Sequence, residues 1–201
     1  MPHARTPRIG LLGGTFDPPH IGHLAAAKAV KDQLGLDEVR LVVANDPWQK
    51  SAKRNVSAAS IRLEMTRELV KDIPGLVVDD CEIRRGGQTF TADTLEDIHR
   101  GEPDAEIFLI VGADTAARIH TWNRPETVLA LSTLVVVNRG TSTAELPELA
   151  GARVVQVHMD PVDIASSQIR VMVRAGESVV DVTNEAVSEL IAQHSLYEVA
   201  S

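Results

Sequence analysis

The chain has 201 residues, of which 44% are hydrophobic, and a formal net charge of −8. It is long enough to bury the core of one domain, and it lacks the basic footprint of a general nucleic-acid coat. One cysteine excludes an internal disulfide, and no apolar run approaches the ~20 residues of a membrane span or forms a secretory signal. We therefore expect a single domain over residues 1–201, located in the cytoplasm, with no membrane or nucleic-acid partner.

Short apolar runs alternate with helix-like stretches along the chain. The runs are rich in Val, Ile and Leu without polar alternation, which is typical of strands covered on both faces. This alternation predicts an α/β fold with a doubly wound, mostly parallel sheet, whose ligands lie beyond the carboxyl ends of the strands. The expected strands are Arg8–Leu12, Glu38–Ala44, Leu76–Asp79, Glu106–Val111, Thr133–Asn138 and Arg153–His158. The expected helices are His20–Leu34, Ser57–Ile73, Thr91–Arg100, Pro125–Leu131, Ser166–Ala175 and Asn184–His194.

The helix expected over Ser57–Ile73 has two recognisable local signals. Ser57 is a favourable N-cap residue, because its hydroxyl can accept a bond from a backbone N–H of the first turn. Ile61, Met65 and Leu69 follow at a spacing of four, which places them on one apolar face.

The segment after the first strand reads GGTFDPPHIGHL over residues 13–24. Two glycines permit a tight turn, and His20 and His23 fall on one face of the opening helical turn. Unpaired N–H groups and the positive end of the helix dipole favour an anion there. The segment fits neither a P-loop nor a dinucleotide fingerprint. His-x-x-His lacks the third and fourth ligands of a zinc site, so we predict no metal bound by these residues.

This segment resembles the G-x-F-x-P-x-H-x-G-H signature of the nucleotidyltransferase superfamily, and its fuller form is most similar to bacterial nicotinate-nucleotide adenylyltransferases. The resemblance implies a Rossmann-like fold with helices on both faces of the sheet. It also implies transfer of the adenylyl group of ATP to nicotinate mononucleotide, giving deamido-NAD and pyrophosphate, assisted by Mg²⁺.

The resemblance extends to Arg170 and covers most of the chain. Residues 164–170, IASSQIR, are similar to the family's I-S-S-T-x-x-R element, with Ala165 in place of Ser, and serines are expected to cap the following helix. Residues 45–50, NDPWQK, correspond to a P-P-H-K stretch but carry Trp48 and Gln49. The implied catalytic residues are His20, His23, Lys50 and Arg170. The implied ATP-binding residues are Gly13, Gly14, Phe16, His20, His23, Gly112, Asp114, Ser166, Ser167 and Arg170.

The acceptor is assigned by two further matches. Residues 85–94 resemble a G-x-x-Y-T-x-D-T turn whose backbone amides receive the pyridine carboxylate, and Trp122 matches the tryptophan that stacks on the pyridine ring. An indole against a flat, electron-poor ring is physically reasonable. The implied acceptor-binding residues are Thr15, Lys50, Phe90, Thr91 and Trp122.

The alternatives are another adenylyltransferase of this superfamily, with nicotinamide mononucleotide or phosphopantetheine as acceptor, and a non-catalytic nucleotide-binding domain. The sequence leaves the acid or amide preference and the formation of a homo-oligomer open. The negative net charge does not argue against ATP, because residues 1–54 carry eight Lys and Arg against five Asp and Glu. Locally focused positive charge can bind a triphosphate in an acidic protein.

Overall fold

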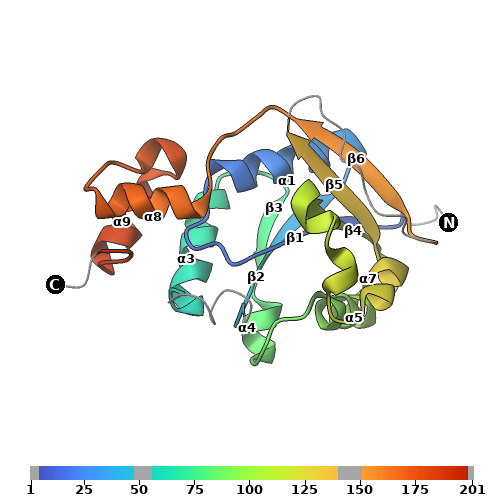
Figure 1. Cartoon of the computed structure of the whole chain (residues 1–201). Helices are drawn as coiled ribbons and strands as arrows, with labels where there is room; N and C mark the ends of the chain where they lie inside the picture. The colour runs from blue at the N-terminus through green and yellow to red at the C-terminus, as the bar shows by residue number, and fades with distance from the viewer. Residues whose placement is uncertain (1–4, 48–55, 140–150, 199–201) are drawn as a thin grey trace. The chain divides into compact units, whose positions relative to one another are not determined.

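The computed structural model describes residues 5–47, 56–139 and 151–198. Six strands form one sheet in the order β3-β2-β1-β4-β5-β6 (Figure 1). β4 is parallel to both β1 and β5, and β6 is parallel to β5. The strands are β1 (Arg8–Gly14), β2 (Glu38–Val43), β3 (Leu76–Asp79), β4 (Glu106–Gly112), β5 (Thr133–Arg139) and β6 (Val154–Met159).

Helices connect each pair of successive strands from β1 to β5. The α-helices are α1 (Ile21–Leu34), α3 (Ala59–Val70), α4 (Cys81–Arg85), α5 (Thr91–Gly101), α6 (Ala113–Ala116), α7 (Pro125–Leu131), α8 (Ser166–Arg174) and α9 (Glu185–Gln193), and the 3₁₀ turns are η1 (Ile119–Thr121) and η2 (Val180–Val182). The strand order reverses direction between β1 and β4, so right-handed crossovers place helices on both faces of the sheet. The predicted Rossmann-like, doubly wound fold is confirmed. Within the described ranges, every helix is too short or too polar to span a membrane.

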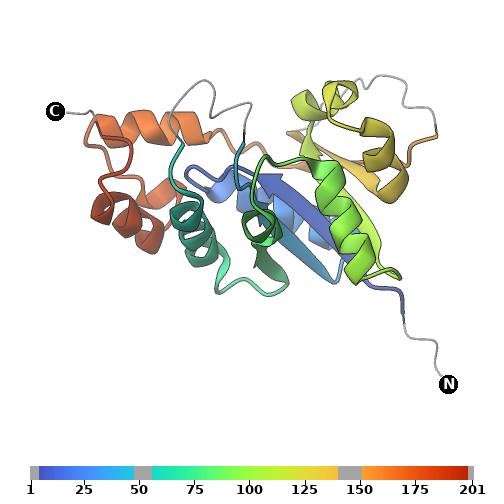
Figure 2. The ribbon, with the colours of Figure 1, turned by 90° about the horizontal axis from the view of Figure 1, so that it is seen from below.

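The chain divides into two interleaved compact units. Unit 1 comprises Met1–Gly13, Ala26–Arg40 and Phe90–Pro161, and unit 2 comprises Gly14–Ala25, Leu41–Thr89 and Val162–Ser201. In unit 1, α5 lies in front of the strands, and the part of α1 from Ala26 onward lies behind them (Figure 2). In unit 2, α3 contacts both β3 and α9, burying Met65, Leu69 and Val187. The single domain over residues 1–201 stays a prediction.

Most expected elements occur within a few residues of their predicted bounds, and the differences concern their ends. β1 and β4 each continue through glycine, to Gly14 and Gly112. The prediction that Ser57 caps its helix is wrong. The helix begins at Ala59 with Ala58 at the N-cap, and the backbone carbonyl of Ser57 accepts a bond from Arg62 Nε at 2.8 Å. The short helices α4 and α6 were not expected, because four or five residues carry no readable periodicity.

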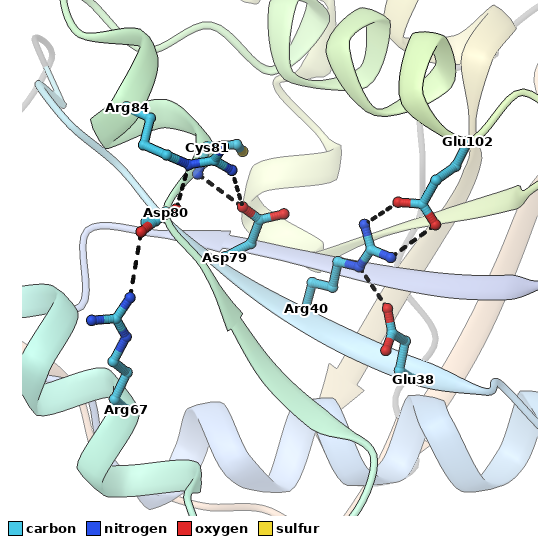
Figure 3. Close-up of polar contacts among 8 residues, drawn as sticks. All are labelled: Glu38, Arg40, Arg67, Asp79, Asp80, Cys81, Arg84 and Glu102. Carbon is cyan, nitrogen blue, oxygen red and sulfur yellow. Dashed lines mark hydrogen bonds and ion pairs between the residues drawn. The ribbon is translucent and has the colours of Figure 1, made fainter.

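In unit 1, a half-buried ion-pair group ties the start of β2 to the end of α5 (Figure 3). Arg40 donates from Nη1 and Nη2 to the two carboxylate oxygens of Glu102, at 2.5 and 2.9 Å, and from Nε to Glu38 at 2.6 Å. Burial alone would lower the pKa of Arg40, but the bonds to Glu102 and Glu38 raise it overall. The hydrogen bond from Arg40 lowers the pKa of Glu102.

We expect Glu102→Gln to lower the free energy of unfolding by about 1 kcal/mol at pH 7, because it removes one side of a bidentate pair. Since the folded-state pKa of Glu102 is lowered, this contribution is present above the ordinary glutamate pKa of 4.5. It is lost as the pH falls through the lower folded-state value. Denaturant titrations at pH 7 and pH 3.5 measure the difference.

Glu106→Gln is the matched control. The Glu106 carboxylate is 54% exposed and lies 3.4 Å from Arg8, so its removal should change stability little at either pH. A Glu102→Gln variant with the same pH dependence as wild type would contradict the role of the pair.

Candidate functional site

Unit 2 contains the segment that joins β1 to α1, here called the β1–α1 loop (residues 15–20). All six of its residues are buried. The expected tight turn through Gly13 and Gly14 is wrong, since both lie in β1 and the positive φ, 50°, falls on Phe16. Gly14 is needed for a different reason, because a Cβ there would lie 2.7 Å from the Phe16 ring. A non-glycine residue at positive φ is strained and persists only where its surroundings hold it.

His20 and His23 cap the N-terminus of α1 reciprocally. Nδ1 of His20 accepts from the Gly22 N–H at 3.2 Å, and Nδ1 of His23 accepts from the His20 N–H at 3.1 Å. This is the arrangement of a capping box, with imidazoles in place of the usual side chains. The contacts assign the proton of each neutral ring to Nε2. The ring centroids lie 3.8 Å apart, so the two imidazoles lie side by side at the positive end of a helix.

The start of α8 contacts the same loop in unit 2. The Ser166 hydroxyl donates to the Pro18 carbonyl at 2.9 Å, and Arg170 Nη1 donates to the Asp17 carbonyl at 2.8 Å. The expectation that serine caps this helix is wrong, because Ala165 occupies the N-cap and the Ser166 hydroxyl is directed to the loop. Gln168 Oε1 accepts from the Ala165 N–H at 2.6 Å. A guanidinium has five N–H donors, so the loop contact of Arg170 is compatible with binding an anion.

Arg62 on α3 is a residue of this site that the sequence did not single out. It is 1% exposed, and its guanidinium donates to the carbonyls of Thr15 and Asn45, at 2.7 and 2.9 Å, besides that of Ser57. Arg62 thus joins the β1–α1 loop to the end of β2. The sequence carries no signal for this role, because an arginine on a helix is ordinarily exposed, and its burial beside Leu63 and Thr66 is seen only in the structure.

The loop after β2 is fixed at its described end. The Asn45 N–H donates to the Thr89 hydroxyl at 3.1 Å, and Asn45 Nδ2 donates to the Gly87 carbonyl at 2.9 Å. Lys50, predicted as a catalytic and acceptor-binding residue, lies outside the described residues, as do Trp48 and Gln49.

In unit 1, Phe90 is the N-cap of α5 and Thr91 its first residue. No hydrogen bond from the Phe90 side chain caps the helix, so backbone N–H groups of its first turn are suited to an anion. Both residues are half-buried. This geometry is compatible with the predicted carboxylate contact through backbone amides.

The remaining predicted residues of unit 1 follow β4. Gly112 ends the strand as the N-cap of α6, and Asp114 is exposed in the first turn of that helix. Trp122 is half-buried and directly follows η1. The structure therefore gathers Gly14, Thr15, Phe16, His20, His23, Ser166, Ser167 and Arg170 in unit 2, and it places Gly13, Phe90, Thr91, Gly112, Asp114 and Trp122 in unit 1.

Among the described residues, the single cysteine offers no alternative centre. Burial, followed by the negative charge of Asp79, raises the pKa of the Cys81 thiol to about 12, which keeps it protonated and a poor nucleophile. Around it in unit 2, Arg84 and Arg67 pair with Asp80 at the surface (Figure 3). Across residues 5–47, 56–139 and 151–198, no three His, Cys, Asp or Glu side chains cluster as a metal site.

Comparison with known proteins gives consistent matches. The sequence model of the family described as Cytidylyltransferase-like matches residues 11–172. A Corynebacterium kroppenstedtii protein named "Probable nicotinate-nucleotide adenylyltransferase" is 40% identical over 193 residues, covering 95% of this chain and 91% of that protein. One of the same name from Lactiplantibacillus plantarum is 37% identical, covering 98% and 90%. The structure of Plasmodium falciparum nicotinic acid mononucleotide adenylyltransferase complexed with NaAD has a TM-score of 0.78 at 16% identity, covering 95% and 97% of the two chains, and so shares the fold.

Proposed function

Because the chain belongs to the Cytidylyltransferase-like family, we propose that it transfers the adenylyl group of ATP to nicotinate mononucleotide. The products are deamido-NAD and pyrophosphate, in NAD biosynthesis. Bacterial relatives that are 35–40% identical over nearly the whole chain carry the name of this activity. One observation in the structure supports the chemistry most directly: His20 and His23 both turn Nδ1 to the backbone at the N-terminus of α1, which makes Nε2 the protonated nitrogen of each neutral ring.

In the proposed reaction a 5′-phosphate oxygen of the mononucleotide attacks the α-phosphorus of ATP. The bond from that phosphorus to the oxygen bridging the α- and β-phosphates breaks, and pyrophosphate leaves. The attacking oxygen is already anionic at neutral pH, so no general base is required. Catalysis then depends on positioning and on stabilising the charge that builds on the phosphates.

The residues of unit 2 suit that task. We assign to His23 Nε2 a hydrogen bond to the α-phosphate in the transition state, and to His20 Nε2 one to the neighbouring phosphates. Arg170 and the first N–H groups of α8 add further positive potential, since the N-cap residue Ala165 has no side-chain acceptor for them. Lys50 is proposed as an additional phosphate contact. Phe16 is only 2% exposed, so we expect its backbone rather than its ring to contact ATP.

Mg²⁺ is proposed as the cofactor. It supplies neutralisation of phosphate charge when bound, and in nucleotide enzymes it is commonly held by substrate phosphates and water with few protein ligands. With no cluster of three candidate ligands in the described ranges, the proposal places the ion on the phosphates of ATP.

The acceptor is assigned to unit 1. A carboxylate on the pyridine ring would gain from the first-turn N–H groups of α5, whereas a neutral amide would not gain from the helix dipole. We assign the carboxylate to the amides around Phe90 and Thr91, and the face of the ring to Trp122. Gly112 and Asp114 are assigned to the nucleoside part of ATP.

The experiment is a panel of acceptors with ATP and Mg²⁺, followed by pyrophosphate release. We expect equal amounts of deamido-NAD and pyrophosphate from nicotinate mononucleotide, and a kcat/KM at least about tenfold lower for nicotinamide mononucleotide because the charge contact is lost. Reactions without acceptor, and with EDTA, are the controls. Preferential use of phosphopantetheine would overturn the acceptor, and tight ATP binding without turnover of any acceptor would overturn the reaction. A cytoplasmic location remains a prediction.

A further inference from the structure

Unit 2 ends in a strained turn that carries the single tyrosine of the chain. After α9, Ser195 and Tyr197 both have positive φ, 46° and 67°. Neither is glycine, so each conformation is costly and must be held by other contacts. The turn directs the Tyr197 hydroxyl to Oδ1 of Asp17, which it reaches at 2.7 Å across 180 residues of sequence.

Asp17 lies in the buried β1–α1 loop and is only 1% exposed. A buried carboxylate must be satisfied by hydrogen-bond donors, and a donor with a fixed position also fixes the carboxylate. Burial, reinforced by the charge of Asp17, raises the pKa of Tyr197, which keeps the phenol protonated and able to donate. The contact is therefore maintained throughout the neutral pH range.

The loop is held at neighbouring points by other parts of unit 2. Arg170 donates a hydrogen bond to the backbone carbonyl of Asp17, and Ser166 donates one to that of Pro18. Tyr197 donates to the side chain of Asp17. The strained Phe16 precedes these points, and His20, whose N–H orients the His23 ring, follows them. The backbone conformation of the loop therefore sets the orientation of both imidazole rings.

We propose that Tyr197 is a positioning residue for adenylyl transfer, which fixes the β1–α1 loop through Asp17 and thereby the two histidine donors. The inference rests on the proposed function. It gives the C-terminal turn a role in the chemistry that acts through Asp17, and it accounts for the two strained residues in that turn.

The first test is Tyr197→Phe, which removes one oxygen atom. We expect kcat to fall about tenfold with KM for the acceptor little changed, since a small displacement of the donors affects the transition state most. The matched control is Thr183→Val. Thr183 is buried before α9, and its hydroxyl donates to the Val179 carbonyl at 2.7 Å, so the variant also deletes one buried hydroxyl from the C-terminal region. Equal kcat for the two folded variants would overturn the proposal.

A double-mutant cycle tests whether the effect of Tyr197 on kcat is transmitted through Asp17. If Tyr197 acts through Asp17, then Tyr197→Phe causes no additional loss of kcat in an Asp17→Asn background. A further tenfold loss in that background would overturn the proposal.

A second measurement needs neither a folded Tyr197→Phe variant nor activity. Because the chain has one tyrosine, growth with 3-fluorotyrosine labels position 197 alone. We expect its ¹⁹F resonance to shift in Asp17→Asn, and an unchanged resonance would overturn the contact. Failure of the proposed function is distinguishable, since wild type would then release no pyrophosphate while the ¹⁹F result would stand.

Discussion

His23→Asn should reduce turnover by about 10³-fold while leaving the free energy of unfolding within about 0.5 kcal/mol of wild type. The asparagine Oδ1 can occupy the position of the imidazole Nδ1 and accept the His20 N–H, so the cap of α1 is retained. The donor at the Nε2 position is lost. Steady-state pyrophosphate release and denaturant unfolding measure the two effects separately.

Two other substitutions at the same position separate capping from catalysis. His23→Gln places an amide N–H near the Nε2 position and should recover part of the lost turnover. His23→Ala removes both functions, so it should lose about 1 kcal/mol of stability as well as activity. If His23→Asn retains turnover within tenfold of wild type, the Nε2 donor is not the catalytic group.

The sheet was predictable because its strands carry runs of Val, Ile and Leu that only a doubly covered sheet buries well. The Leu134–Val137 run, for instance, lies within β5, and its side chains are almost fully buried. His20 and His23 were also predictable, because their spacing at the start of a helix is a local property. Their capping role was less accessible, since it depends on which ring nitrogen faces the backbone.

The supports of the β1–α1 loop could not be predicted from local sequence. Tyr197 is separated from Asp17 by 180 residues, and Ser166 from Pro18 by 148. The predicted tight turn at Gly13 and Gly14 was wrong for a similar reason. Gly14 accommodates the ring of Phe16, and the positive φ falls on Phe16, whose neighbours Thr15 and Asp17 are bonded to Arg62 and Arg170. Tertiary constraints of this kind override the local preference of glycine for such a conformation.

Arg62→Met should lower the free energy of unfolding by about 3–4 kcal/mol, the largest stability effect expected for this chain. Methionine is unbranched and apolar and can fill much of the space of the arginine stem, but it removes the donor of one buried bond, to Thr15, and of two half-buried bonds, to Asn45 and Ser57. Each bond to a charged donor contributes more than an ordinary one. Urea unfolding at pH 7 measures the loss.

The comparison with Arg67→Met decides whether the buried bonds are the cause. Arg67 lies on the same helix but is 56% exposed, and its contact with Asp80 is 3.4 Å long, so the identical substitution there should cost little. Arg62→Lys keeps the charge without the planar fork, and it can serve the diverging carbonyls of Thr15 and Asn45 only in part. It should therefore fall between wild type and methionine. An Arg62→Met variant within 1 kcal/mol of wild type would mean that the loop keeps its conformation without this donor.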